Sequence, residues 1–307
     1  MSESGYHLPS LVARLRQIVG PDNVRLDEPL SEHTTFKIGG PADIFVTPDD
    51  IDEIGDILIA CEDAGMPYFI LGCGSDLLVS DAGYHGVVIS LTEELIGVSA
   101  EGTKLICQAG VTLREASEMA CELGLSGLEF ACGIPGSVGG ACYMNAGAYG
   151  GCIADVLDEV RVLTHAGNIV ELGVDELNLG YRQSRIADEG LVLLSATFAL
   201  RKGDPDDIRE RMEDLTQQRE EKQPLELPSA GSTFKRPEGY FAGKLITDAG
   251  LKGYQVGGAA VSRKHAGFVV NLGGATASDV RAVIAHVQDE VMRQFGVKLE
   301  PEVRFLG

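Results

Sequence analysis

The most informative segment of this chain is the glycine-rich run Glu129-Phe-Ala-Cys-Gly-Ile-Pro-Gly-Ser-Val-Gly-Gly-Ala-Cys-Tyr-Met-Asn-Ala-Gly-Ala-Tyr-Gly-Gly151. Its seven glycines can adopt positive φ and let a ligand approach the backbone without a Cβ in the way. The run has no Lys or Arg, so an anion bound here would be held mainly by backbone amides, as in other concave amide arrays. A flat or phosphate-bearing cofactor is such a ligand. A plain glycine-rich connection around a tightly packed turn is the alternative.

The net charge argues against one large class of partners. The chain has 307 residues, with 25 Lys and Arg against 46 Asp and Glu, and a net charge of −21. Nucleic-acid binding depends on clustered basic residues, so this composition disfavours a nucleic-acid partner. If the substrate is anionic, basic residues must cluster at its binding site, as a local exception to the acidic charge of the chain. The length and the 44% apolar content allow a large core and indicate about two domains.

The cysteines and the N-terminal residues indicate where the protein works. The seven cysteines form no C-x-x-C pair and no zinc spacing, so we expect no metal site and interpret them as reduced packing residues, with a reactive thiol as the alternative. Residues 1–7 contain no basic segment leading into an apolar one, and no run reaches the roughly 18 apolar residues of a membrane span. We therefore expect a cytoplasmic protein with no membrane partner.

Hydrophobic periodicity predicts both helices and strands along the chain. Helical patterns cover Leu8–Val19, 51–61, 113–123, 205–215 and 278–295, the last capped by Ser278. Strand patterns cover 42–47, 67–71, 87–91, 104–109, 157–163, 168–172, 191–200 and the alternating tail 297–305. This order favours an α+β fold over a doubly wound sheet, and Gly72-x-Gly74 lacks the third glycine of a Rossmann fingerprint. The turn at Gly203 is predicted to be a domain boundary.

Several separate motifs together resemble one enzyme family. They are, in chain order, Thr34-Thr-Phe-Lys-Ile-Gly-Gly40, Leu71-Gly-Cys-Gly-Ser75, Gly133-Ile-Pro-Gly-Ser-Val-Gly-Gly140, Met144-Asn-Ala-Gly-Ala-Tyr149, Tyr181-Arg-Gln-Ser184, Ala230-Gly-Ser-Thr-Phe-Lys235 and Pro301-Glu-Val-Arg304. The set is similar to that of the UDP-N-acetylenolpyruvoylglucosamine reductases, flavoproteins of bacterial cell-wall precursor synthesis. The match runs from about His33 to Arg304 in the family's order, and each motif alone would be weak evidence.

The resemblance implies a cofactor and a division of the chain. An α+β FAD-binding region of the vanillyl-alcohol-oxidase type would consist of two subdomains, residues 1–100 and 101–203, followed by a substrate-binding domain, residues 204–307. FAD would be bound without a covalent bond. By resemblance, the residues that contact FAD would be Gly72, Cys73, Gly74, Ser75, Asp76, Gly133, Ile134, Pro135, Gly136, Ser137, Gly139, Gly140, Asn145, Ala146 and Gly147.

The implied reaction has two halves. NADPH reduces FAD and leaves, and the enolpyruvyl ether of UDP-N-acetylglucosamine then accepts the hydride to give UDP-N-acetylmuramate. Arg182 and Glu302 match family positions that would stabilise the enolate, and Ser232 would deliver the proton. From the residues alone, an ordinary surface cation, a solvent-facing charge and a turn serine are the alternatives.

Basic residues on both sides of Ser232 supply the expected local exception to the acidic charge. Lys222, Lys235 and Arg236 could neutralise the diphosphate of the substrate, and Tyr181 is a further predicted substrate contact. By resemblance, Lys222 matches a family position that contacts the substrate. Lys244 has the simpler interpretation of a solvated helix residue. Two positions depart from the family pattern, because Asp76 and Arg236 stand where Asn is frequent. About fifty residues separate Arg182 from Ser232, too few for the tyrosine-bearing insertion of one branch, so the chain resembles the compact branch.

Two other functions fit parts of this pattern. An oxidase of a small alcohol could use the same cofactor fold, with FAD tethered to His33 or Cys73. A protein that binds a flavin or nucleotide without catalysis could keep the glycine-rich segments alone. The joint presence of Arg182, Ser232 and Glu302 argues against the second of these.

Overall fold

The structure is a computed structural model that describes residues 8–307. It contains two compact units that alternate along the sequence. Unit 1 comprises the chain up to Leu26 together with Ile44–Cys73 and Gly86–Gln218, and unit 2 comprises Asp27–Asp43, Gly74–His85 and Arg219–Gly307. The expected division at residues 100 and 203 stays a prediction. The expectation about a targeting segment concerns residues 1–7, which lie outside the described residues.

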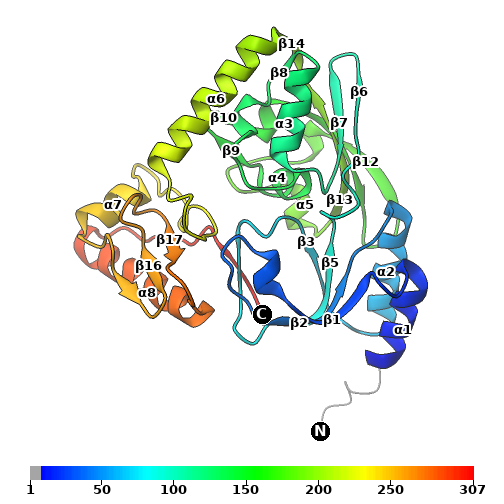
Figure 1. The fold of residues 1–307 in the computed structure, drawn as a ribbon, viewed down its shortest axis with the longest axis horizontal. Coiled ribbons are helices and arrows are strands. Elements are labelled where there is room, and N and C mark those ends of the chain that lie inside the picture. Colours follow the sequence, from blue (N-terminus) through cyan, green and yellow to red (C-terminus); the bar gives the residue numbers. More distant parts are fainter. Residues whose placement is uncertain (1–7) are drawn as a thin grey trace. The chain divides into compact units, whose positions relative to one another are not determined.

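The N-terminal part of the chain combines a helix pair with a sheet (Figure 1). The helices α1 (Leu8–Val19) and α2 (Ile51–Asp63) pack together, as expected from their apolar periodicity. Asp50 caps α2 by accepting hydrogen bonds from the amides of Asp52 and Glu53. The sheet has the order β1-β2-β5-β3, with bounds β1 (Val24–Pro29), β2 (Pro41–Val46), β3 (Tyr68–Leu71) and β5 (Tyr84–Ser90). The β3–β5 pair is parallel.

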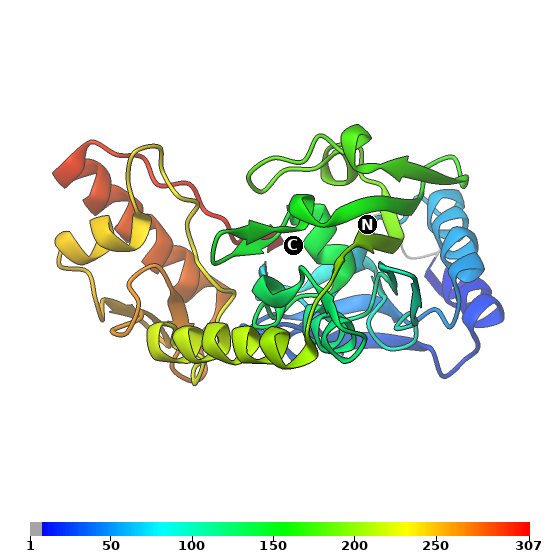
Figure 2. The same ribbon diagram turned by 90° about the horizontal axis from the view of Figure 1, so that it is seen from above.

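A second sheet of unit 1 is antiparallel throughout. Its order is β12-β11-β13-β7-β6, with bounds β6 (Val98–Glu101), β7 (Lys104–Gln108), β11 (Leu157–Leu163), β12 (Ile169–Gly173) and β13 (Val192–Ala199). The remaining elements of this unit are α3 (Leu113–Glu122), β8 (Leu125–Ser126), α4 (Val138–Met144), β9 (Gly147–Ala148), β10 (Gly151–Cys152), α5 (Arg185–Asp188) and β14 (Arg201–Lys202). Helix α6 (Pro205–Lys222) continues without interruption from unit 1 into the first residues of unit 2 (Figure 2).

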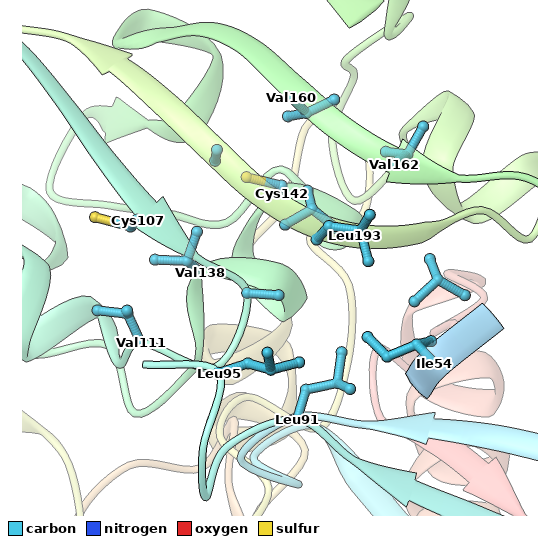
Figure 3. Packing of buried hydrophobic residues seen from close by; sticks show 14 of the residues in the cluster. Ile54, Leu91, Leu95, Cys107, Val111, Val138, Cys142, Val160, Val162 and Leu193 are labelled. Atoms are coloured by element: carbon cyan, nitrogen blue, oxygen red, sulfur yellow. The ribbon is translucent and has the colours of Figure 1, made fainter. Parts of the chain in front are cut away.

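Helix α4 lies within the glycine-rich run and was not expected. Two of its seven residues are glycines, which are poor helix formers, so local propensity gave no signal. Tertiary packing compensates, because Val138, Ala141 and Cys142 are buried and α4 packs against β13. Figure 3 shows Val138 and Cys142 among the aliphatic side chains of this core.

Unit 2 contains a small sheet with helices. The strands β15 (Gln255–Val256), β16 (Ala259–Val261) and β17 (Val269–Asn271) form an antiparallel sheet against which α8 (Ala277–Phe295) packs, and α7 (Ala242–Asp248) contacts α8. The edge pair β4 (Leu77–Val79) and β18 (Arg304–Leu306) is parallel. No helix among residues 8–307 has the length and apolar character to span a membrane. All seven cysteines are free thiols, as expected from their spacing.

Three further details of unit 2 differ from the sequence expectations. Helix α7 was not expected. The cap of α8 is Thr276, not Ser278, because the Thr276 hydroxyl accepts from the amide of Asp279 in a reciprocal capping box. The tail is a strand only at its end, since Pro301 has no N–H for a ladder and forms an isolated bridge with Phe234.

Candidate active site

The first candidate site lies in unit 1, where the chain leaves β3 and meets the start of α4. A Cβ built on Gly72 would lie 2.5 Å from Ser137 Oγ, closer than real side chains approach. The Ser137 side chain caps α4 by accepting a hydrogen bond from the amide of Gly140 at 3.3 Å. We call the backbone of Gly72, Cys73 and 133–137 the cradle. Glycine at position 72 keeps the wall of the cradle free of side-chain atoms.

Backbone hydrogen bonds fix the cradle to the segment that precedes α3. Leu113 N donates to Gly136 O at 2.9 Å, and Val138 N donates to Val111 O at 2.7 Å. The amide of Gly139 is also used within the protein, because it donates to Ala109 O. The expectation of a row of unblocked amides is therefore wrong for Val138, Gly139 and Gly140, whose N–H groups are all satisfied.

Four amides of the cradle remain available to a ligand. Among residues 8–307, the backbone N–H groups of Gly72, Cys73, Gly133 and Ser137 donate to no protein acceptor. No Lys or Arg occurs between residues 129 and 151. This donor set fits the phosphates of a dinucleotide, because oriented amides bind oxyanions without a cationic side chain. The residues present therefore fit an FAD pyrophosphate.

Of the two side chains considered for a covalent flavin, the Cys73 thiol is poorly prepared for it. Burial, with a smaller contribution from Glu115, raises the pKa of the Cys73 thiol to about 11 against the opposing effect of a hydrogen bond with Ser137. The reactive thiolate is therefore scarce at neutral pH. The imidazole Nε2 of His33 lies 2.8 Å from Glu28 Oε1 in unit 2. The oxidase interpretation loses support from Cys73.

A tight loop in unit 1 carries Arg182. Gly180 and Gln183 exchange backbone hydrogen bonds on either side of Tyr181 and Arg182, and Arg182 adopts a left-handed φ of 57°. The guanidinium lies 5.1 Å from the centroid of the exposed Tyr181 ring. Asn145, which ends α4 in a left-handed conformation, donates from Nδ2 to Gly180 O at 3.0 Å.

In unit 2, Ser232 and Glu302 lie on paired segments. Thr233 O accepts from the amide of Glu302 at 2.8 Å, and Lys235 N donates to Glu300 O at 2.9 Å. Thr233 itself is buried, and its hydroxyl accepts from the amide of Val269. Ser232 is exposed next to this anchor and Glu302 is half-buried. The sequence expectation that these two residues belong to one site is consistent with this pairing. Arg182 is in unit 1, so the convergence of all three stays a prediction.

The basic residues of unit 2 differ in how they are held. Arg236 places its guanidinium 4.0 Å from the centroid of the exposed Phe241 ring. Lys222 is the exposed last residue of α6, and Lys235 is half-buried. Lys244 pairs with Asp248 at 2.6 Å on α7, which agrees with its interpretation as a solvated helix residue.

Comparison with known proteins identifies the family. Residues 223–306 match the model of the UDP-N-acetylenolpyruvoylglucosamine reductase C-terminal domain, and residues 42–173 match the model of an FAD binding domain. The UDP-N-acetylenolpyruvoylglucosamine reductase of Clostridium beijerinckii is 53% identical over 92% of this chain and 93% of that protein. The chain belongs to the UDP-N-acetylenolpyruvoylglucosamine reductase family.

Other UDP-N-acetylenolpyruvoylglucosamine reductases agree with this. That of Clostridium perfringens is 52% identical over 95% of this chain and 96% of its own length. The crystal structure of UDP-N-acetylenolpyruvylglucosamine reductase from Thermus caldophilus has a TM-score of 0.79 and 35% identity, and the match covers 92% of this chain and 98% of that one. The resemblance stated from the motifs and the α+β class with an FAD-binding region are confirmed.

Proposed function

We propose that this protein catalyses the FAD-dependent, NADPH-driven reduction of UDP-N-acetylglucosamine enolpyruvate to UDP-N-acetylmuramate. The observation that carries the proposal is the 53% identity with a UDP-N-acetylenolpyruvoylglucosamine reductase over nearly the full length of both proteins. The proposed activity belongs to peptidoglycan precursor synthesis, and we place it in the cytoplasm, where nucleotide substrates and NADPH are found.

The proposed cofactor site is the cradle and its neighbours. When bound, FAD takes hydride from NADPH and supplies it to the substrate's double bond. The free amides of Gly72, Cys73, Gly133 and Ser137 support a pyrophosphate at the cradle. We propose that the rest of the sequence-derived set also contacts FAD, but not through free amides at Ile134, Pro135, Gly136, Gly139 and Gly140, which have none to offer; the other members of this set are Gly74, Ser75, Asp76, Ala146 and Gly147.

Arg182 and Glu302 are proposed to stabilise negative charge on the substrate. Addition of hydride to the terminal carbon of the enolpyruvyl group leaves negative charge on the adjacent carbon and on its carboxylate. Arg182 is permanently charged and presents a planar fork of donors that suits a carboxylate. Glu302 contributes if it is protonated or if it orients a water molecule. Such preorganised electrostatic stabilisation is commonly the largest contribution to catalysis.

Ser232 is proposed to deliver the proton that completes the reduction. A serine hydroxyl is a weak acid, but the enolate carbon is strongly basic, so the position of the hydroxyl matters more than its acidity. The exposed hydroxyl beside the buried Thr233 anchor supports this role. Lys222, Lys235, Arg236 and Tyr181 are proposed to bind the nucleotide diphosphate and sugar, in agreement with their sequence-derived assignment.

The half-reactions separate the proposed function from its alternatives. The purified protein should show a flavin absorption band that NADPH bleaches and that the enolpyruvyl nucleotide restores without oxygen. Denaturation should release the colour into solution, whereas an oxidase with a tethered flavin would keep it on the polypeptide. Ser232→Ala should leave bleaching by NADPH unchanged and slow the anaerobic restoration by about 10²–10⁴-fold, the usual contribution of a general acid. Equal loss in both halves would contradict the role of Ser232.

A further inference from the structure

Two side chains attach the Arg182 loop to the end of helix α4. Ser184 Oγ donates to Tyr143 O at 2.7 Å and accepts from the amide of Ala187, so one hydroxyl both anchors the loop and caps α5. On the other side of the loop, Asn145 Nδ2 donates to Gly180 O at 3.0 Å. The two anchors flank Tyr181-Arg182, and both reach the last turn of α4 or its cap.

Both anchors are buried and bonded within the protein. Ser184 is fully buried and Asn145 is 8% exposed. Asn145 Oδ1 accepts from the amide of Ala154 at 3.0 Å, so both ends of its amide are engaged. A role of Asn145 as a flavin contact, as derived from the sequence, does not explain these two hydrogen bonds. A structural connection between α4 and the Arg182 loop explains them.

The loop needs such anchors because of its backbone. Arg182 has φ of 57°, a conformation that costs a non-glycine residue roughly 1 kcal/mol or more and persists only where the surroundings impose it. The bond from Gln183 N to Gly180 O is long, at 3.4 Å. The short loop would therefore hold Arg182 weakly by itself.

We propose that Ser184 and Asn145 are positioning residues for Arg182, which transmit the placement of the cradle to the catalytic guanidinium through α4. The helix is capped at one end by Ser137 of the cradle and at the other by Asn145. Seven helical residues span roughly 10 Å at about 1.5 Å per residue. The inference rests on the proposed function, because it assumes that Arg182 acts on the substrate.

Three variants test the anchors. Ser184→Ala removes one anchor. Asn145→Asp removes the donor to Gly180 O, keeps the acceptor for Ala154 N and tolerates the left-handed backbone. The matched control is Ser117→Ala, because Ser117 is 1% exposed and its hydroxyl donates to Leu113 O at 2.7 Å and Leu128 O at 2.9 Å, away from the loop.

Hydrogen exchange measures the loop without reference to activity. Peptides covering residues 178–186 should exchange at least tenfold faster in Ser184→Ala and in Asn145→Asp than in the Ser117→Ala control. Exchange unchanged from the control in both variants would overturn the inference. This measurement stays decisive even if the protein does not reduce the enolpyruvyl nucleotide, a result that would refute the proposed function alone.

Half-reaction kinetics then connect the loop to Arg182. In Ser184→Ala, reoxidation by the enolpyruvyl nucleotide should slow at least tenfold, while reduction by NADPH stays within twofold of the control. In an Arg182→Ala background, adding Ser184→Ala should change reoxidation less than twofold, because coupled residues are not additive. A full additional loss in that background would overturn the positioning role, as would equal losses in both half-reactions. If Ser184→Ala does not fold, hydrogen exchange of residues 178–186 in Asn145→Asp carries the test.

Discussion

The substitution Gly72→Ala tests the cradle most directly. Gly72 does not have positive φ, so alanine fits its backbone and any effect comes from the space that the new methyl group occupies. The Cβ would lie 2.5 Å from Ser137 Oγ, whereas ordinary contacts begin at 3.4 Å. The hydroxyl must therefore move by about 0.9 Å, the difference between these two distances.

The cost to folding should be moderate. Ser137 Oγ is the end of a rotatable side chain, so it can leave its place, but it then gives up the cap on the amide of Gly140. Loss of a serine cap costs about 0.5–2 kcal/mol. For a chain of this size that corresponds to a fall in Tm of roughly 2–4 °C per kcal/mol. The variant should fold, with the new methyl group at the cradle wall.

The assay is the affinity of the folded variant for FAD. We expect Kd to rise at least tenfold, measured by flavin fluorescence during titration of the apoprotein. Gly55→Ala in α2 is the matched control, because its Cβ would meet nothing within 4 Å, and it should keep FAD affinity and gain stability. In Gly72→Ala/Ser137→Ala the hydroxyl is gone, and affinity should stay low. FAD affinity of Gly72→Ala equal to that of the control would refute the cradle.

Three further substitutions or modifications probe stability and reactivity. Asp81 accepts hydrogen bonds from the amides of Ala277 (2.6 Å) and Ser278 and from the Ser278 hydroxyl. Burial alone would raise the pKa of Asp81, but these hydrogen bonds lower it. The substitution Asp81→Asn weakens all three bonds. Urea unfolding should show a loss of about 1 kcal/mol at pH 7, and the difference from wild type should shrink as the pH falls below about 4, because the contribution of a carboxylate with a lowered pKa is lost there. Thr276→Ala should cost about 1 kcal/mol in the same measurement at pH 7 through loss of the α8 cap. Iodoacetamide at pH 8 should modify Cys73 at least a hundredfold more slowly than it modifies free cysteine. A pKa of about 11 leaves about 0.1% of the Cys73 thiol as thiolate at this pH, whereas a thiol with a pKa of 8.5 is about one quarter thiolate. Rapid labelling of Cys73 in a peptide map would contradict this prediction.

The hydrophobic pattern of the sequence correctly predicted those helices and strands in which the apolar positions are also the buried ones. Helix α1 has the bounds expected from its apolar spacing, and α2 begins at residue 51, where its helical pattern was expected to begin. Strand β11 likewise has its expected bounds, and four of its seven residues are buried. In these elements, propensity, pattern and burial all favour the same structure.

The remaining features depend on contacts between distant residues. Helix α4 forms despite Gly139 and Gly140 because buried neighbours stabilise it. The bond from Asn145 to Gly180 O joins residues 35 positions apart, and its donor is an ordinary-looking polar residue in a turn. The serine of Tyr181-Arg-Gln-Ser184 offered one usable signal, since a serine before a short apolar segment is a typical helix cap. Nothing local indicated that its hydroxyl would reach Tyr143 O.

The electrostatics of the proposed reaction contain an apparent conflict, because an acidic chain must bind anionic ligands. FAD, NADPH and the nucleotide sugar all carry phosphates, and the protein has a net charge of −21. Screening limits this conflict, since exposed charges farther than a Debye length, about 8 Å at physiological ionic strength, act weakly. Binding is then decided by nearby groups, which in the proposed assignment are uncharged amides at the cradle and Lys222, Lys235 and Arg236 in unit 2. The surface charge can therefore serve solubility without preventing the binding of phosphates.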